Sequence, residues 1–256
     1  MLTSMRGLLA ATLLASSGLA ATPAFADETA APGDFTVSGN VAIVSDYRFR
    51  GLSLSAGDIA VQGSINVNHA SGFYIGTWAS SLEDSAIYGH TEVDLYGGWT
   101  GEVSSGLTAD VGLLYYVYPN GHTGDANVFE PYASLTAAIG PATAKVGVNY
   151  AWDQDSLGGD DNLYLYTDLS AGIPDTPVSL AAHLGYTDGA LSPKLLADIA
   201  NGATTPRTGG GFDWSLGATF AITEKLSIGA SYIGVEGASV SDFSDDAIVG
   251  TLKLTF

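Results

Sequence analysis

The chain has 256 residues, and its composition excludes several classes of protein. With 27 acidic residues against 8 basic ones, the formal net charge is −19, which argues against nucleic acid as a partner because such partners require basic surfaces. Hydrophobic residues make up 46 % of the chain, so the acidity does not indicate disorder. The absence of cysteine excludes disulfides, thiol catalysis and cysteine-ligated zinc.

The N-terminus, residues 1–26, has the pattern of a secretory signal peptide. Arg6 precedes an apolar stretch at residues 7–15, and Ala24-Phe25-Ala26 forms a small-x-small cleavage site. The apolar stretch is too short to cross about 30 Å of hydrocarbon, which argues against a membrane helix. We therefore predict an exported chain with a short periplasmic tail at residues 27–34 and one domain at residues 35–256.

The rest of the chain consists of segments in which apolar and polar residues alternate, as in half-exposed β-strands. The predicted strands are residues 35–48, 60–69, 73–80, 91–100, 107–118, 127–139, 142–152, 162–173, 178–187, 212–221, 226–235 and 247–256. No segment after the N-terminus is long and apolar enough for a membrane helix, so a membrane location requires a closed barrel. The even number of strands permits closure of an antiparallel barrel.

Charged residues occur on one face of these segments only. The apolar face of all twelve carries no Asp, Glu, Lys or Arg, whereas the other face carries ten charged residues, seven of them acidic: Asp46, Arg48, Glu92, Asp94, Asp110, Glu130, Lys145, Asp168, Asp213 and Lys253. A lipid-facing surface requires this exclusion, but the core of a soluble sandwich does too. The pattern alone leaves both architectures open.

The lengths of the connections favour the membrane barrel. Links after the even-numbered segments are short, and links after the odd-numbered ones are longer, the longest running over residues 188–211. This alternation is typical of periplasmic turns and extracellular loops, and it predicts that both termini are periplasmic.

Aromatic residues of the apolar face fall into two groups by height, as expected at two membrane interfaces. The predicted periplasmic group is Phe35, Trp99, Phe220 and Phe256, with Phe73 if its strand is oriented that way, and the predicted outer group is Tyr47, Tyr115, Phe129, Tyr150, Trp152, Tyr186, Phe212 and Trp214. Segment 73–80 has apolar residues on both faces, which leaves its orientation open.

Residues 40–53 contain the sequence Ser-Asp-Tyr-Arg-Phe-Arg-Gly and closely resemble the TorF-type family of porins, with further matching stretches at residues 71–78, 92–98 and 110–116. The resemblance is strong over residues 35–120 and diffuse afterwards. It implies an outer-membrane barrel that acts as a porin, and it carries over no ligand-binding residue. The terminal Phe256 resembles the signal that outer-membrane assembly machinery reads.

The charged residues of the signature suggest a constriction. Asp46 and Arg48 have the parity of the lumen, the interior of the barrel, Tyr47 has the parity of the lipid face, and Arg50 begins the first long loop. We predict that Arg48 or Arg50 reaches a carboxylate on the facing wall, or else that such pairs only neutralise buried charges and fix the strand register. The carboxylate candidates are Glu92, Asp94 and Glu130.

Other lumen residues extend this hypothesis. Lys145 and Asp168 lie on adjacent segments and are candidates for an ion pair. Five tyrosines of the same parity are expected to narrow the lumen: Tyr96, Tyr116, Tyr118, Tyr164 and Tyr166. Residues 192–200, within the longest loop, are expected to form a short helix over or in the mouth. Among all these, Tyr116, Arg50 and the ten charged residues are the lumen candidates.

The sequence gives little support to an outer-membrane enzyme, the chief rival class. His69, His90 and His122 lie at a rim or in loops, and His183 faces inward without a recognisable serine and acid beside it. The acidic loop 153–161 lacks the ligand pattern of an EF-hand, because Leu157 and Tyr164 occupy ligand positions. No catalytic residue, metal or cofactor is expected.

The resulting prediction is an outer-membrane channel for passive diffusion of small hydrophilic solutes, cationic or neutral. The alternatives are a non-conducting structural or adhesive barrel and, less favoured, an enzyme. The expected partners are the lipid bilayer with lipopolysaccharide, the assembly machinery and small solutes. The sequence does not indicate an oligomeric state.

Overall fold

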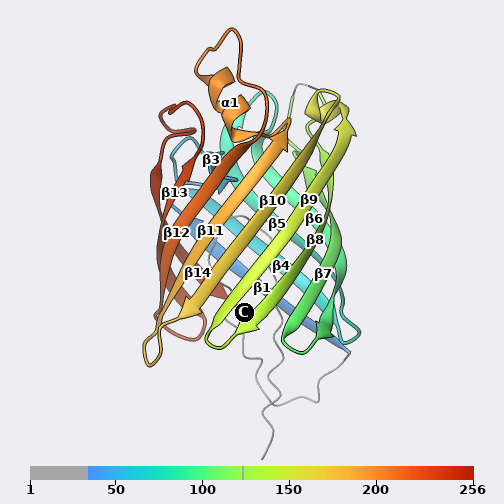
Figure 1. Cartoon of the computed structure of the whole chain (residues 1–256), viewed down its shortest axis with the longest axis vertical. Coiled ribbons are helices and arrows are strands. Elements are labelled where there is room, and N and C mark those ends of the chain that lie inside the picture. Colours follow the sequence, from blue (N-terminus) through green and yellow to red (C-terminus); the bar gives the residue numbers. More distant parts are fainter. Residues whose placement is uncertain (1–33, 123) are drawn as a thin grey trace, which may run out of the picture.

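The computed structural model describes residues 34–122 and 124–256, so the predicted signal peptide and almost all of the predicted tail lie outside the described residues. Within these residues twelve antiparallel strands form one closed barrel (Figure 1). The barrel strands are β1 (Phe35–Val44), β4 (Ala60–His69), β5 (Phe73–Ser85), β6 (Gly89–Ser104), β7 (Leu107–Val117), β8 (Val128–Ile139), β9 (Ala142–Gln154), β10 (Asp160–Gly172), β11 (Val178–Gly189), β12 (Gly211–Ala221), β13 (Leu226–Val235) and β14 (Ala247–Thr255).

Four shorter elements lie in the connections: β2 (Arg48–Phe49), β3 (Leu52–Ser53), the 3-10 helix η1 (Asp155–Leu157) and α1 (Pro193–Ala200). The helix expected at residues 192–200 is thus present, and it stands above the barrel at the end with the long loops (Figure 1). In the described part of the chain, no helix is both long and apolar enough to cross a bilayer.

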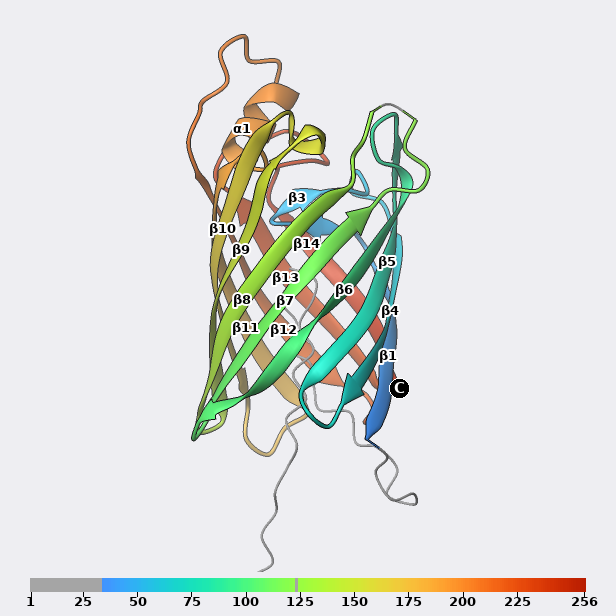
Figure 2. The ribbon, with the colours of Figure 1, turned by 90° about the vertical axis from the view of Figure 1, so that its right-hand side faces the viewer.

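Closure depends on β1, which pairs with β4 on one side and with β14 on the other. The first ladder runs from Phe35↔His69 to Val44↔Ala60, and the second from Asn40↔Thr255 to Val44↔Thr251. The backbone of Phe256 extends the ladder between β1 and β14, donating from its N–H to the Gly39 oxygen at 3.0 Å. The predicted closed antiparallel barrel is confirmed, with the start of β1 and the end of β14 at its short-turn end (Figure 2).

The outward face of the barrel is apolar along its middle. Leu216 at the centre of β12 exposes 63 % of its surface, and Ile75 on β5 exposes 65 %. The orientation of β5, which the sequence left open, is resolved: Phe73 and Ile75 point outward, while Tyr74 and Trp78 are buried in the interior. This exterior has the character of a surface in contact with lipid.

Outward aromatic side chains stack on one another toward the long-loop end. Tyr115 and Phe129 have centroids 4.0 Å apart in a stacked pair, and Phe129 and Trp152 continue the stack at 6.1 Å. Tyr47 does not belong to this group. It is buried and its ring packs 5.3 Å from that of Trp78, inside the barrel.

The misplacement of Tyr47 has a local cause. Strand β1 ends at Val44, and not at residue 48 as predicted, because Ser45 bonds to Gly250 through both its backbone N–H and its side-chain oxygen, and the chain then turns inward. Strand parity ceases to assign faces once the strand ends.

The alternation of short and long connections holds with two exceptions, residues 86–88 and residues 155–159, the latter being no longer than the connection 173–177 at the other end. Residues 70–72, 105–106, 140–141, 173–177 and 222–225 connect strands at one end, and residues 45–59, 118–127, 155–159, 190–210 and 236–246 connect them at the other. The expected long loop between β5 and β6 is only residues 86–88, because both strands extend beyond their predicted ends, with an irregular register between Ser81 and Ser85.

Replacement of Leu216 by Arg tests the assignment of the outward face. A charge at the middle of a lipid-facing strand is expected to lower the free energy of unfolding by about 2–4 kcal/mol. The measurement is denaturant unfolding of the protein in lipid vesicles. The control is Ile199→Arg in α1, an equally exposed apolar site outside the barrel wall, where the change is expected to stay within about 0.5 kcal/mol. Equal losses at both sites contradict a lipid-facing wall.

Candidate functional site: a loop that crosses the lumen

The first loop, residues 45–59, folds into the barrel and is organised around the buried Asp46. Ser53 and Ser55 donate hydrogen bonds from their hydroxyls to this carboxylate, at 2.6 and 3.1 Å, and Arg48 forms an ion pair with it. Ser55 also accepts a bond from the backbone N–H of Tyr47 at 2.8 Å. The short strands β2 and β3 therefore form a compact hairpin inside the ring of strands (Figure 2).

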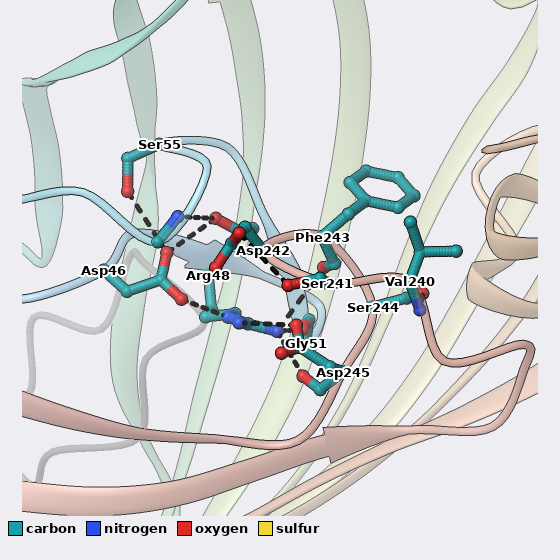
Figure 3. Close-up of polar contacts among 12 residues, drawn as sticks. Asp46, Arg48, Gly51, Ser55, Val240, Ser241, Asp242, Phe243, Ser244 and Asp245 are labelled. Atoms are coloured by element: carbon teal, nitrogen blue, oxygen red, sulfur yellow. Dashed lines mark hydrogen bonds and ion pairs between the residues drawn. The ribbon is translucent and has the colours of Figure 1, made fainter. Parts of the chain in front are cut away.

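A second loop, residues 236–246, holds the first loop against one side of the lumen (Figure 3). Arg48 donates from Nη1 to the Asp245 backbone oxygen at 2.7 Å, and its Nη2 lies 3.4 Å from the Asp245 carboxylate. The backbone N–H of Ser53 donates to the Phe243 oxygen at 2.8 Å. Gly51 has φ +81°, and a Cβ there would meet Val235 at 2.2 Å, so this approach requires glycine.

From this hairpin Arg50 reaches the far side of the ring. Its Nη2 donates to both oxygens of Glu130 on β8, at 2.7 and 2.8 Å, and both residues are almost completely buried. Tyr116 and Asn149 also donate to Glu130, each at 2.9 Å. The guanidinium lies 4.1 Å from the centre of the Tyr164 ring. The arginine thus closes part of the lumen by joining the first loop to β7, β8, β9 and β10.

The environment keeps this arginine charged. Burial acts to lower the pKa of Arg50, but Glu130, through its charge and its hydrogen bond, together with Tyr116 and Tyr164, outweighs burial, and the pKa lies above its ordinary value. The backbone of Arg50 is left-handed, with φ 46°, a conformation that costs a non-glycine residue about 1 kcal/mol and that only a well-packed loop maintains.

Beside this crossing, His183 on β11 bridges two carboxylates. Its Nδ1 lies 2.6 Å from Asp168 and its Nε2 lies 3.0 Å from Asp213, while the Tyr164 hydroxyl lies 2.8 Å from Nε2. The sequence placed no acid beside this histidine, and the structure places two. Both nitrogens face carboxylates, so the arrangement differs from a triad in which one nitrogen faces a nucleophilic hydroxyl.

The expected Lys145–Asp168 ion pair is not formed. The two residues are directly opposite each other on β9 and β10, but Asp168 contacts His183 and the Lys145 ammonium lies 5.6 Å from the centre of the Tyr166 ring. Among residues 34–122 and 124–256, no carboxylate lies within ion-pair distance of Lys145. His183 is therefore the partner of Asp168, and the Tyr166 ring is the neighbour of Lys145, in place of the predicted direct contact.

The structure brings some of the predicted lumen residues together and leaves others apart. Asp46 pairs with Arg48, Glu130 with Arg50 and Tyr116, and Asp168 with Asp213 through His183. Asp110 accepts a hydrogen bond from Tyr74 at 2.6 Å. Glu92, Asp94 and Lys253 stand apart from these pairs, and Phe256 lies on the outside with half its surface exposed.

Sequence reasoning missed Asn149, Tyr74 and the Asp245 loop as partners. Asn149 has lumen parity but carries no charge, and Tyr74 lies in segment 73–80, whose orientation the sequence left open. Asp245 lies in a loop, where no periodicity exists to assign a direction. In every case the missed information is a distance between segments far apart in the chain.

Replacement of Glu130 by Gln tests the contact that spans the lumen. It leaves the Arg50 charge buried without a counter-charge, which is expected to cost about 3–5 kcal/mol in unfolding free energy. The double variant Arg50→Met/Glu130→Gln is expected to recover most of this loss, because no buried charge remains. Denaturant unfolding in detergent micelles measures both.

The control for this cycle is Arg207→Met, which removes the exposed partner of an ion pair with Asp198 in the long loop outside the barrel. Its expected cost is less than about 1 kcal/mol. If the single and double variants at the crossing are equally destabilised, Glu130 does not act through the charge of Arg50.

Known protein structures include barrels that are similar to this one. The chain is similar in structure to a "KdgM porin", with a TM-score of 0.54 and 8 % identity over 86 % of this chain and 98 % of that one. A "KdgM porin in complex with disordered oligogalacturonate" gives a TM-score of 0.53, also at 8 % identity, over 86 % of this chain and 97 % of that one. An outer membrane channel from Pseudomonas putida F1 gives 0.47 at 12 % identity, over 88 % and 96 %.

At these identities the likeness establishes a barrel fold shared with porins. No curated protein matches the chain. Residues 28–256 match a family described as "Bacterial protein of unknown function (Gcw_chp)", and the chain belongs to this family.

Proposed function

We propose that the protein is an outer-membrane pore for passive diffusion of small hydrophilic solutes. The observation that carries this proposal is the combination of an exterior that is apolar along its middle with a closed interior, in which seven of the ten charged residues of the predicted lumen set are buried. Such a barrel is stable in lipid and offers a polar path through it. The porin fold and the resemblance of residues 35–120 to the TorF-type porins point the same way.

In this proposal the chain is exported and its barrel lies in the outer membrane. The long-loop end faces the exterior and both ends of the barrel chain face the periplasm, as the alternation of connections indicates. The outward stack that includes Tyr115, Phe129 and Trp152 lies at the outer interface, in contact with lipopolysaccharide. The assembly machinery reads the last strand and Phe256.

The proposed selectivity is for cations and neutral solutes over anions. Seven of the ten charged lumen residues are acidic, and a carboxylate-lined passage attracts cations and repels anions. One of the similar structures is a porin in complex with oligogalacturonate, a polyanion. An acidic lumen does not favour such a solute, so we do not transfer it to this chain.

The first loop sets the narrowest part of the proposed path. Arg50 crosses the lumen to Glu130, and the buried Tyr47 and Tyr116 fill space beside the crossing. Passage is therefore expected on the remaining side of the crossing, and conductance is expected to be small.

The test is conductance of the purified protein in planar lipid bilayers. Stepwise currents are expected, with a reversal potential under a salt gradient that indicates cation preference. Arg50→Ala removes the crossing side chain and is expected to increase the unit conductance, whereas Arg207→Ala, above the barrel, is expected to leave it unchanged. Silent bilayers at all voltages for the unmodified protein and for Arg50→Ala reject the pore.

A second candidate, a non-conducting structural or adhesive barrel, is favoured by the same crossing. The hairpin is anchored on both sides, by Arg48 to Asp245 and by Arg50 to Glu130, and aromatic side chains pack around it. A lumen completely filled in this way does not conduct. The absence of current with both proteins supports this candidate, and currents that increase in Arg50→Ala contradict it.

A further inference from the structure

The buried carboxylates of the lumen have partners among the described residues, with the exception of two on β6. Asp46 has Arg48, Glu130 has Arg50, and Asp168 and Asp213 share His183. Glu92 is completely buried, and within residues 34–122 and 124–256 no donor makes a well-formed hydrogen bond with either of its oxygens, although the hydroxyls of Tyr47 and Tyr118 face this carboxylate. Asp94 is 9 % exposed, and one of its oxygens is also buried without a hydrogen-bond partner in the described residues.

The two carboxylates occupy one wall of the lumen. They are two residues apart on a strand, so both point inward from β6. Burying two like charges side by side without a counter-charge is unfavourable, and removal from water increases the repulsion between them. The described part of the chain supplies no Lys, Arg or His within ion-pair distance of either one.

Aromatic rings surround this pair. Asp94 lies directly opposite Trp78 on β5 and opposite Tyr116 on β7. Tyr47, which enters from the first loop, packs on Trp78 at 5.3 Å between ring centres, and its side chain faces Glu92. The carboxylates therefore lie among aromatic side chains that face the same part of the lumen.

The tyrosine side chains next to these two carboxylates remain uncharged. Burial is the main cause that raises the pKa of both Tyr47 and Tyr118 well above the ordinary value, and the charge of Glu92 is the second cause. Their phenols therefore stay neutral and present hydroxyl groups and ring faces rather than additional anions. Negative charge next to aromatic faces is the pattern that binds ammonium groups, because the rings attract a cation and replace part of its hydration shell.

The donor set distinguishes between cations. In the described residues there is no group of three or more metal-ligating side chains, so the arrangement does not favour a divalent metal ion. Glu92 is completely buried, whereas Asp94 is partly exposed to the lumen. A cation therefore approaches the two carboxylates from the Asp94 side, and it must be small.

We propose that Glu92 and Asp94, enclosed by Tyr47, Trp78 and Tyr116, bind the ammonium group of a small organic cation in the lumen. This proposal adds a solute class to the proposed pore function. It rests on that function only for the biological role of the binding. Binding itself requires the folded barrel and no conduction.

The experiment measures binding of methylammonium to the full chain, folded in detergent micelles at neutral pH. Methylammonium chloride replaces potassium chloride at constant ionic strength, so that the titration reports preference over potassium. The readout is the fluorescence of Trp78 in a background where the other three tryptophans, Trp99, Trp152 and Trp214, are replaced by Phe. A saturable change in the millimolar range is expected.

The variant Glu92→Gln/Asp94→Asn is expected to weaken this binding at least about tenfold, equivalent to one decade in Kd. The matched control is Glu102→Gln, a carboxylate on the same strand that is exposed at the short-turn end, and its affinity is expected to equal that of the parent. Tetraethylammonium, which is too large for the Asp94 side, and calcium are expected not to compete.

Several results overturn the site: no saturable change with methylammonium, equal binding of potassium, or undiminished binding in the double variant. If the double variant fails to fold, as judged by its mobility on unheated gels, Asp94→Asn alone and the competition series with the parent protein decide the question. Conductance without methylammonium binding rejects the site and leaves the pore. Binding without conductance rejects the pore and leaves the site.

Discussion

The structure depends on the pairing of β1 with β14. In hydrocarbon no water is present to satisfy a free strand edge, so each backbone N–H and C=O of a spanning strand must find its partner within the sheet. The register from Asn40↔Thr255 to Val44↔Thr251 provides this for the last edge. Once the sheet is closed, alternation along each strand separates the residues into an outside, which contacts lipid, and a confined interior.

Confinement explains why the charged residues of the first loop are paired. A loop that enters the interior brings its polar groups away from bulk water, and each must be satisfied there. The first loop meets this requirement twice, at Asp46 with its serines and Arg48, and at Arg50 with Glu130. The left-handed backbone at Arg50 shows that these contacts are strong enough to hold an unfavourable conformation.

The sequence predicted the properties that repeat along a strand. Alternation assigned Leu216 and Phe129 to the outside and Glu130 and Asp213 to the inside, and all four assignments agree with the burial in the structure. Tyr47 was assigned to the outside because the pattern continues past Val44, where the strand itself ends. The pattern records the chemistry of alternate residues, and it contains no signal for the two hydrogen bonds between Ser45 and Gly250 after which the chain turns inward.

The candidate site was harder to predict, because it depends on distances between segments. The sequence proposed three carboxylates as targets of an arginine, and charge alone does not distinguish among them. The structure does: Glu130 receives donors from Arg50, Tyr116 and Asn149, whereas Glu92, buried to the same extent, receives none from the described residues. A carboxylate neutralised by its own chain has little field left to act on a solute. One that lacks such a partner retains its field when it is ionised. For this reason the proposed ammonium site is at the unpaired acids of the lumen and not at the most conspicuous ion pair.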